Sequence, residues 1–114
     1  MNPAVYDRLL DLARNRRLTT YSDIAPLAGL TMDVEADREA ISEILGEILE
    51  NEARAGRPLL TALVVHRGDD NNPGEGFFRT AAELGRFQYA RDPLTRLEFW
   101  VRAVHDVHNH WSST

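Results

Sequence analysis

The sequence predicts a single α+β domain over residues 1–114 that is mostly helical, with one β-hairpin and a C-terminal helix. Apolar residues recur at helical spacing in three long segments, and one short apolar run has the composition of a buried strand. No linker, internal repeat or low-complexity tract divides the chain. With 114 residues and 43% hydrophobic content, the chain has the usual size of one domain with one core.

Two helices are expected before residue 30. An Asn-Pro pair at the N-terminus is a typical helix start, and the apolar spacing after it predicts a helix over residues 3–16. In the segment TTYSDIAPLAGL, Thr20 and Asp23 have the spacing of a capping box, and Gly29 is a natural stop. A short second helix is expected there, kinked by Pro26.

The clearest helix is predicted over residues 37–55. Its apolar positions follow the i, i+3, i+4, i+7, i+8 pattern of an amphipathic helix. Gly56 then supplies a left-handed C-terminal cap. The apolar set consists of Ile41, Ile44, Leu45, Ile48 and Leu49.

A β-hairpin is expected after this helix. The run from Leu59 to His66 is rich in Leu, Thr, Ala and Val and is bounded by proline and glycine, which predicts a strand buried on both faces. The segment GDDNNPGEG has turn chemistry throughout. Phe77 and Phe78 after it predict a short returning strand.

Two further helices are predicted. Thr80 and Glu83 have the spacing of a second capping box, opening a short helix that Gly85 closes. Asp92 and Pro93 are the expected cap and first residue of the last helix. One face of that helix should pack on the core through Leu97, Trp100, Val101, Val104, His108 and Trp111.

Three helices followed by a hairpin is the plan of a winged-helix domain. The segments TTYSDIAPLAGL, ISEILGEILENE, RPLLTALVVHRG and GEGFFRTAAELG occur in the order seen in the DNA-binding domain of alkylguanine-DNA alkyltransferases and alkyltransferase-like proteins, which this sequence resembles over roughly residues 19–80. It also resembles small bacterial proteins with a PLL-A-LVV strand and a PG-GFF turn. The first resemblance implies nucleic-acid binding. The reactive cysteine and the histidine after it have no counterpart, so alkyl transfer is excluded.

Composition excludes several classes of chemistry. Without cysteine the chain has no disulfide, no thiol nucleophile and no cysteine-bound zinc. All 13 basic residues are arginine, so a P-loop lysine is absent. No apolar run reaches the roughly 20 residues that span a bilayer, and the N-terminus does not read as a signal peptide. We therefore expect a cytoplasmic protein with no cofactor and no membrane partner.

The acidity of the chain is concentrated in one segment. Residues 31–52 hold eight acidic residues and one arginine, a net charge of -7 against -5 for the whole chain. On the predicted helix the outward positions are Glu39, Glu43, Glu47 and Glu50. The first hypothesis is therefore a non-catalytic binding or regulatory module that contacts a protein partner through this helix.

Two alternatives remain open. A nucleic-acid-binding winged helix would use the hairpin and the arginines Arg14, Arg16, Arg17, Arg54, Arg57, Arg67 and Arg79. A metal-dependent enzyme would use the C-terminal histidines, of which His105 and His108 have the i, i+3 spacing of helical metal ligands.

Two smaller groups are interpreted as structural. Asp69, Asp70 and Glu75 are expected to be solvated turn residues, because their spacing does not match a calcium loop. His66 with Arg67 is expected to be a strand end that reaches solvent.

Overall fold

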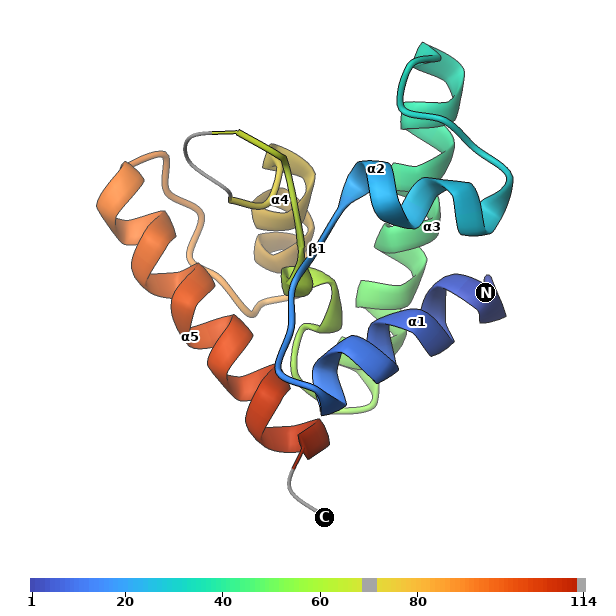
Figure 1. The fold of residues 1–114 in the computed structure, drawn as a ribbon. Coiled ribbons are helices and arrows are strands. Elements are labelled where there is room, and N and C mark those ends of the chain that lie inside the picture. The colour runs from blue at the N-terminus through green and yellow to red at the C-terminus, as the bar shows by residue number, and fades with distance from the viewer. Residues whose placement is uncertain (69–71, 113–114) are drawn as a thin grey trace.

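The computed structural model describes residues 1–68 and 72–112 (Figure 1). The α+β class is confirmed, because helices dominate and one two-stranded parallel sheet is present. In chain order the elements are α1 (Pro3–Arg14), β1 (Thr19–Thr20), α2 (Tyr21–Ile24), η1 (Ala25–Ala28), α3 (Glu35–Arg54), η2 (Leu60–Leu63), β2 (Val64–Val65), α4 (Glu75–Glu83) and α5 (Pro93–Ser112).

The first helices begin where local signals place them, although α1 ends at Arg14, two residues before its predicted end. The Asn2 side chain accepts a hydrogen bond from the Val5 N–H at 3.0 Å, which caps α1. The Thr20 hydroxyl accepts one from the Asp23 N–H at 3.2 Å and caps α2. α2 continues as the 3₁₀ turn η1 through Pro26 and stops at Gly29, whose φ is 72°. The predicted caps and the kink are confirmed.

α3 covers Glu35–Arg54, close to the predicted range, and the chain leaves it through Gly56 at φ 72°. The buried residues of α3 face two clusters of apolar side chains that together form the core. η2 lies inside this core and contacts α1, α3 and α5. In Figure 1, α5 runs down one side of the molecule and α1 and α3 occupy the other.

The predicted β-hairpin is wrong. Half of the apolar run, Leu60–Leu63, folds as the 3₁₀ helix η2, and within the run only Val64 and Val65 form a strand. They pair in parallel with Thr19 and Thr20, not with a returning strand. A short apolar run that is buried all round cannot be assigned to helix or strand by periodicity, and parallel pairing involves residues far apart in sequence. The winged-helix resemblance stays a prediction.

Phe77 and Phe78 lie inside α4, so the predicted returning strand is also wrong. The second capping box is wrong as well, since α4 begins at Glu75 and Thr80 lies within it. The expected stop is confirmed by Gly85, whose φ is 75°. Burial of both phenylalanines against the second core cluster favours the helix over a hairpin.

α5 begins as predicted, because the Asp92 carboxylate accepts a hydrogen bond from the Thr95 N–H at 2.9 Å. Its predicted core face is partly wrong. Leu97 and Val101 are 50% and 53% exposed, whereas Ala103 and Val107 are buried. By helical period Ala103 and Val107 share the face that packs on the core, and Leu97 and Val101 lie at the edge of that face and beyond it. Within the described ranges, no helix has the length and hydropathy to cross a membrane.

Candidate binding cavity and acidic rim

A cavity of about 310 Å³ lies between α3 and α4, and we call it the α3–α4 cavity. Four elements supply its walls, because α2, α3, η2 and the first turn of α4 converge there. The apolar part of its lining comes from Met32, Leu45, Leu49 and Phe77. The polar part comes from Tyr21, Arg38, Ser42, Thr61, His66, Glu75 and Thr80. The cavity therefore combines a hydrophobic body with a few polar groups, as ligand sites usually do.

One edge of the cavity is fixed by an aromatic pair. The rings of Tyr21 and His66 stack with centroids 4.4 Å apart. The Gly74 N–H donates a hydrogen bond to the Tyr21 hydroxyl at 3.3 Å. Burial raises the pKa of Tyr21, and the Gly74 hydrogen bond offsets part of this rise, so the phenol stays neutral at physiological pH.

Gly74 lies in a closely packed place. A Cβ atom there would lie 2.7 Å from His66 Nε2 and 3.3 Å from the Tyr21 hydroxyl. The glycine allows the start of α4 to approach the aromatic pair. His66 and Arg67 follow directly after β2 and both are exposed, as expected for a strand end that reaches solvent. The His66 ring stacks on Tyr21, and Arg67 approaches Asp23 at 3.9 Å.

Thr61 is the buried polar residue of the cavity wall, with 5% exposure. Its hydroxyl makes no hydrogen bond within the described residues. Among the described residues, the one buried side-chain polar atom that has neither solvent contact nor a hydrogen bond is Trp111 Nε1, so the Thr61 oxygen is not sealed. Thr61 lines the cavity and its hydroxyl is not among the sealed atoms, so it is available to bond to a molecule that enters.

The outer face of α3 continues this cavity. A shallow hollow lined by Glu35, Arg38, Glu39, Ser42 and Glu43 shares Arg38 and Ser42 with the α3–α4 cavity. We call Glu35, Glu39 and Glu43 the acidic rim. The Arg38 guanidinium already donates one hydrogen bond to the Met32 carbonyl, at 2.8 Å. The rim therefore keeps a net negative charge.

The structure divides the four predicted acids into two pairs. Glu39 and Glu43 are exposed and have no ion pair among the residues that the structure describes. The Glu47 carboxylate instead forms an ion pair with the N-terminal ammonium group of Met1, at 2.9 Å. Glu50 forms an ion pair with Arg54, one helical turn later. Glu39 and Glu43, the two next to the cavity, are the ones left available to a partner.

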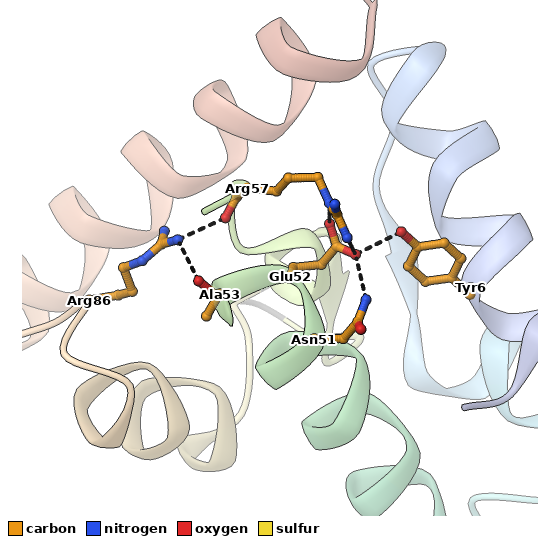
Figure 2. A network of polar contacts seen from close by, with 6 residues as sticks. All are labelled: Tyr6, Asn51, Glu52, Ala53, Arg57 and Arg86. Carbon is orange, nitrogen blue, oxygen red and sulfur yellow. Dashed lines mark hydrogen bonds and ion pairs between the residues drawn. The ribbon is translucent and has the colours of Figure 1, made fainter. Parts of the chain in front are cut away.

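Glu52 is a buried carboxylate that belongs to the scaffold (Figure 2). It accepts hydrogen bonds from Arg57 at 2.6 and 3.1 Å, from the Tyr6 hydroxyl at 2.7 Å and from Asn51 at 3.3 Å. Burial alone raises the pKa of Glu52, but the hydrogen bonds from Arg57 and Tyr6 outweigh it and the net pKa is lowered. The ionised network ties α1 to the end of α3.

The candidate nucleic-acid-binding arginines do not converge. Four of them are engaged with carboxylates of the chain itself: Arg54 with Glu50, Arg57 with Glu52, Arg67 with Asp23 and Arg79 with Glu75. Arg14, Arg16 and Arg17 lie together at and after the end of α1, and Arg16 donates to Asn109 of α5 at 2.9 Å. The structure therefore offers one small basic spot in place of a basic hairpin.

The candidate metal ligands His105 and His108 lie on α5 without a third ligand in the described part of the chain. No group of three or more His, Cys, Asp or Glu side chains within residues 1–68 and 72–112 is arranged to hold a metal ion. His108 Nε2 lies 3.1 Å from the Arg17 carbonyl oxygen, and His105 is exposed. Asp69 and Asp70 lie outside the described residues.

Glu75 is not the solvated turn residue that was expected. It begins α4 and accepts hydrogen bonds from Arg96 and the Tyr89 hydroxyl, both at 2.6 Å. These hydrogen bonds lower the pKa of Glu75 to about 2. Its position at a helix N-terminus also favours negative charge.

A larger hollow of about 700 Å³ lies beside α5 and shares His66, Gly74 and Glu75 with the cavity wall. Arg96 in its lining is held by Glu75 and by the Ala90 carbonyl at 2.6 Å, and it stacks on the Phe78 ring at 4.7 Å. Because this charge already has its partners, the α3–α4 cavity with its unpaired hydroxyl is the stronger candidate site.

No family model matches this chain, and neither a curated protein nor a solved structure matches it. The candidate site therefore rests on its own geometry. Sequence reasoning found Glu39 and Glu43 but missed Thr61 and gave Tyr21 no role. No motif in the sequence marks either residue, because their roles depend on where α2, η2 and α4 meet.

Proposed function

We propose that this protein is a non-catalytic binding module that captures a basic segment of a partner protein. The segment would place one neutral side chain in the α3–α4 cavity and set its cationic residues on the acidic rim. The observation that carries this proposal is the continuity of the two surfaces, which share Arg38 and Ser42.

Charge determines which part of the segment lies where. Glu39 and Glu43 present carboxylates without internal partners, so they favour lysine or arginine outside the cavity. Inside it, the one carboxylate on the first turn of α4, Glu75, is already bonded to Arg96, and the N-terminus of a helix disfavours a further cation. A neutral side chain in the cavity and positive charges on the acidic rim therefore suit both surfaces.

Size and energetics favour a single anchor. Ligand cavities range over roughly 300–1,000 Å³, and this one lies at the lower limit, which suits one large side chain. Exposed ion pairs contribute only about 0.2–1 kcal/mol each, so the rim mainly selects and steers the partner. Burial of the anchor supplies most of the affinity.

The nucleic-acid alternative would depend on Arg14, Arg16 and Arg17, since four of the seven candidate arginines are paired with carboxylates. The metal-dependent alternative would depend on His105 and His108, whose surroundings supply no third ligand in the described part of the chain. The cavity and rim give the protein-binding proposal the fuller site.

The proposal is tested by fluorescence anisotropy with the full chain and labelled peptides. The peptides carry one central tyrosine, phenylalanine, tryptophan or leucine flanked by lysines, and a matched set is flanked by glutamates. We expect saturable, salt-sensitive binding of the lysine set only. Mobility shifts with duplex and single-stranded DNA and RNA at low salt are run in parallel.

A matched pair of variants locates the binding surface. Glu39→Gln with Glu43→Gln removes two charges from the acidic rim, whereas Glu83→Gln with Glu98→Gln removes two exposed charges from α4 and α5. The rim variant should weaken binding about fivefold and the control should match the unmodified protein. Equal effects, no binding of any lysine-flanked peptide, or saturable nucleic-acid binding alone would overturn the proposal.

A further inference from the structure

We propose that Thr61 determines specificity, selecting a tyrosine as the anchor that enters the α3–α4 cavity. This inference rests on the proposed function and names the side chain that the site takes. The observation behind it is Thr61, a residue of the cavity lining that is only 5% exposed, whose hydroxyl is not sealed from solvent and has no hydrogen-bond partner in the described residues.

An unpaired hydroxyl in such a place discriminates between anchors. While the cavity is open, water can reach the Thr61 oxygen. An aliphatic anchor or a phenylalanine ring would displace that water and return no hydrogen bond, which carries a desolvation cost. An anchor with a polar tip restores the bond and avoids this cost.

The remaining walls favour an aromatic body on that polar tip. Leu45 and Leu49 of α3 and Phe77 of α4 contribute apolar surface, and the stacked rings of Tyr21 and His66 lie at one edge. These surfaces suit the flat face of a ring.

The first turn of α4 further favours an oxygen over an N–H group at the tip of the ring. The N–H groups at a helix N-terminus favour partial negative charge, which a phenol oxygen carries and an indole N–H does not. Of the natural aromatic residues, tyrosine satisfies both the walls and the hydroxyl.

The test is a double-mutant cycle between Thr61 and the anchor. Thr61→Val replaces the hydroxyl by a methyl group of similar size, and Thr61→Ser keeps the hydroxyl as the matched control. Lysine-flanked peptides that differ only in tyrosine or phenylalanine are titrated into the unmodified protein and into each variant. Circular dichroism first establishes that the variants keep the helical content of the unmodified chain.

We expect the unmodified protein and Thr61→Ser to prefer the tyrosine peptide by about tenfold, as a net hydrogen bond supplies. In Thr61→Val this preference should fall below about twofold. An equal preference in Thr61→Val, or none in the unmodified protein, would overturn the role of Thr61. Failure of every lysine-flanked peptide to bind would instead overturn the proposed function.

A small probe gives a readout that is independent of the acidic rim. Titration with 4-methylphenol, monitored by NMR, should shift the Thr61 methyl and Tyr21 ring resonances, and titration with toluene should shift them less. Thr61→Val should remove the difference between the two compounds. Equal shifts from both compounds in the unmodified protein would contradict the inference even if the peptides bind.

Discussion

Replacing Arg57 by methionine would leave the buried Glu52 carboxylate without its counterion. Glu52 is fully buried and now takes two hydrogen bonds from the Arg57 guanidinium, at 2.6 and 3.1 Å (Figure 2). In the variant only Tyr6 and Asn51 remain as donors to it. The charge would lose its counterion while staying out of water.

The size of the effect follows from burial. Removing one partner of a buried ion pair typically costs about 3–5 kcal/mol of unfolding free energy. The Arg57 side chain is 32% exposed, so solvent already screens part of the attraction. We therefore expect a loss of about 3 kcal/mol at pH 7. The double variant Glu52→Gln with Arg57→Met should lose less, because it leaves no buried charge.

The pH dependence has a definite sign. In the unmodified protein the pKa of Glu52 is lowered on folding, so its contribution to stability is complete above the unfolded pKa of about 4.3 and is lost as pH falls through the folded pKa. Without Arg57, burial outweighs the remaining hydrogen bonds and raises the folded pKa of Glu52 above the unfolded one. Its contribution then becomes unfavourable as pH rises, so the difference between the two proteins should grow from about pH 4 to 7.

Urea unfolding at several pH values, followed by tryptophan fluorescence, measures this difference. Arg54→Met is the matched control, because Arg54 is 76% exposed and its pairing with Glu50 lies at the surface. The control should stay within about 0.5 kcal/mol of the unmodified protein. The reasoning is refuted if Arg57→Met loses less than about 1 kcal/mol at pH 7, or if the double variant loses as much as the single one.

Three further substitutions test the packing. Gly74→Ala should push His66 off the Tyr21 ring, since its Cβ would lie 2.7 Å from Nε2; we expect a loss of about 1 kcal/mol, and unchanged ring-current shifts of the His66 protons would contradict this. Leu45→Ala removes a core side chain that is 6% exposed and should cost about 2–5 kcal/mol in urea unfolding, with under about 1 kcal/mol counting against the helix phase. Trp100→Phe loses the indole hydrogen bond to the Ala62 carbonyl, 2.9 Å long, and should cost about 1 kcal/mol; an unchanged urea midpoint would refute the value of this bond.

Local signals predicted several helix ends, although not the start of α4. The caps at Thr20 and Asp92 and the stops at Gly29 and Gly85 depend on a few neighbouring residues, so they can be recognised without knowing the tertiary structure. Helix ends are decided within one turn of the chain, which is why these predictions are confirmed.

Contacts with distant elements determine the two segments that were wrongly predicted as strands. The run around Leu60–Leu63 is buried by α1, α3 and α5 at once, and such a run has no polar face whose period would show its backbone conformation. Phe77 and Phe78 follow turn residues, yet they fold as helix because both rings enter the second core cluster. Burial against distant elements outweighed local pattern at both places.

The candidate site was predictable only in part. Glu39 and Glu43 can be recognised as outward positions because helical period fixes the face on which they lie. Thr61 looked like one residue of a buried strand, and its open hydroxyl exists only because α3 and α4 leave a cavity beside it. Such a role depends on where separate elements meet, which spacing along the chain does not encode.

The parallel pairing of β1 with β2 has a consequence for the order of folding. Parallel strands need a crossover connection, and here α2, η1, α3 and η2 lie between Thr20 and Val64. The two strands therefore cannot pair stepwise from a connecting turn. Pairing them before α3 has docked would cost the entropy of closing a long loop and would form few contacts in return. The two strands should then join late, so a destabilising change in β1 should speed unfolding and leave the folding rate nearly unchanged.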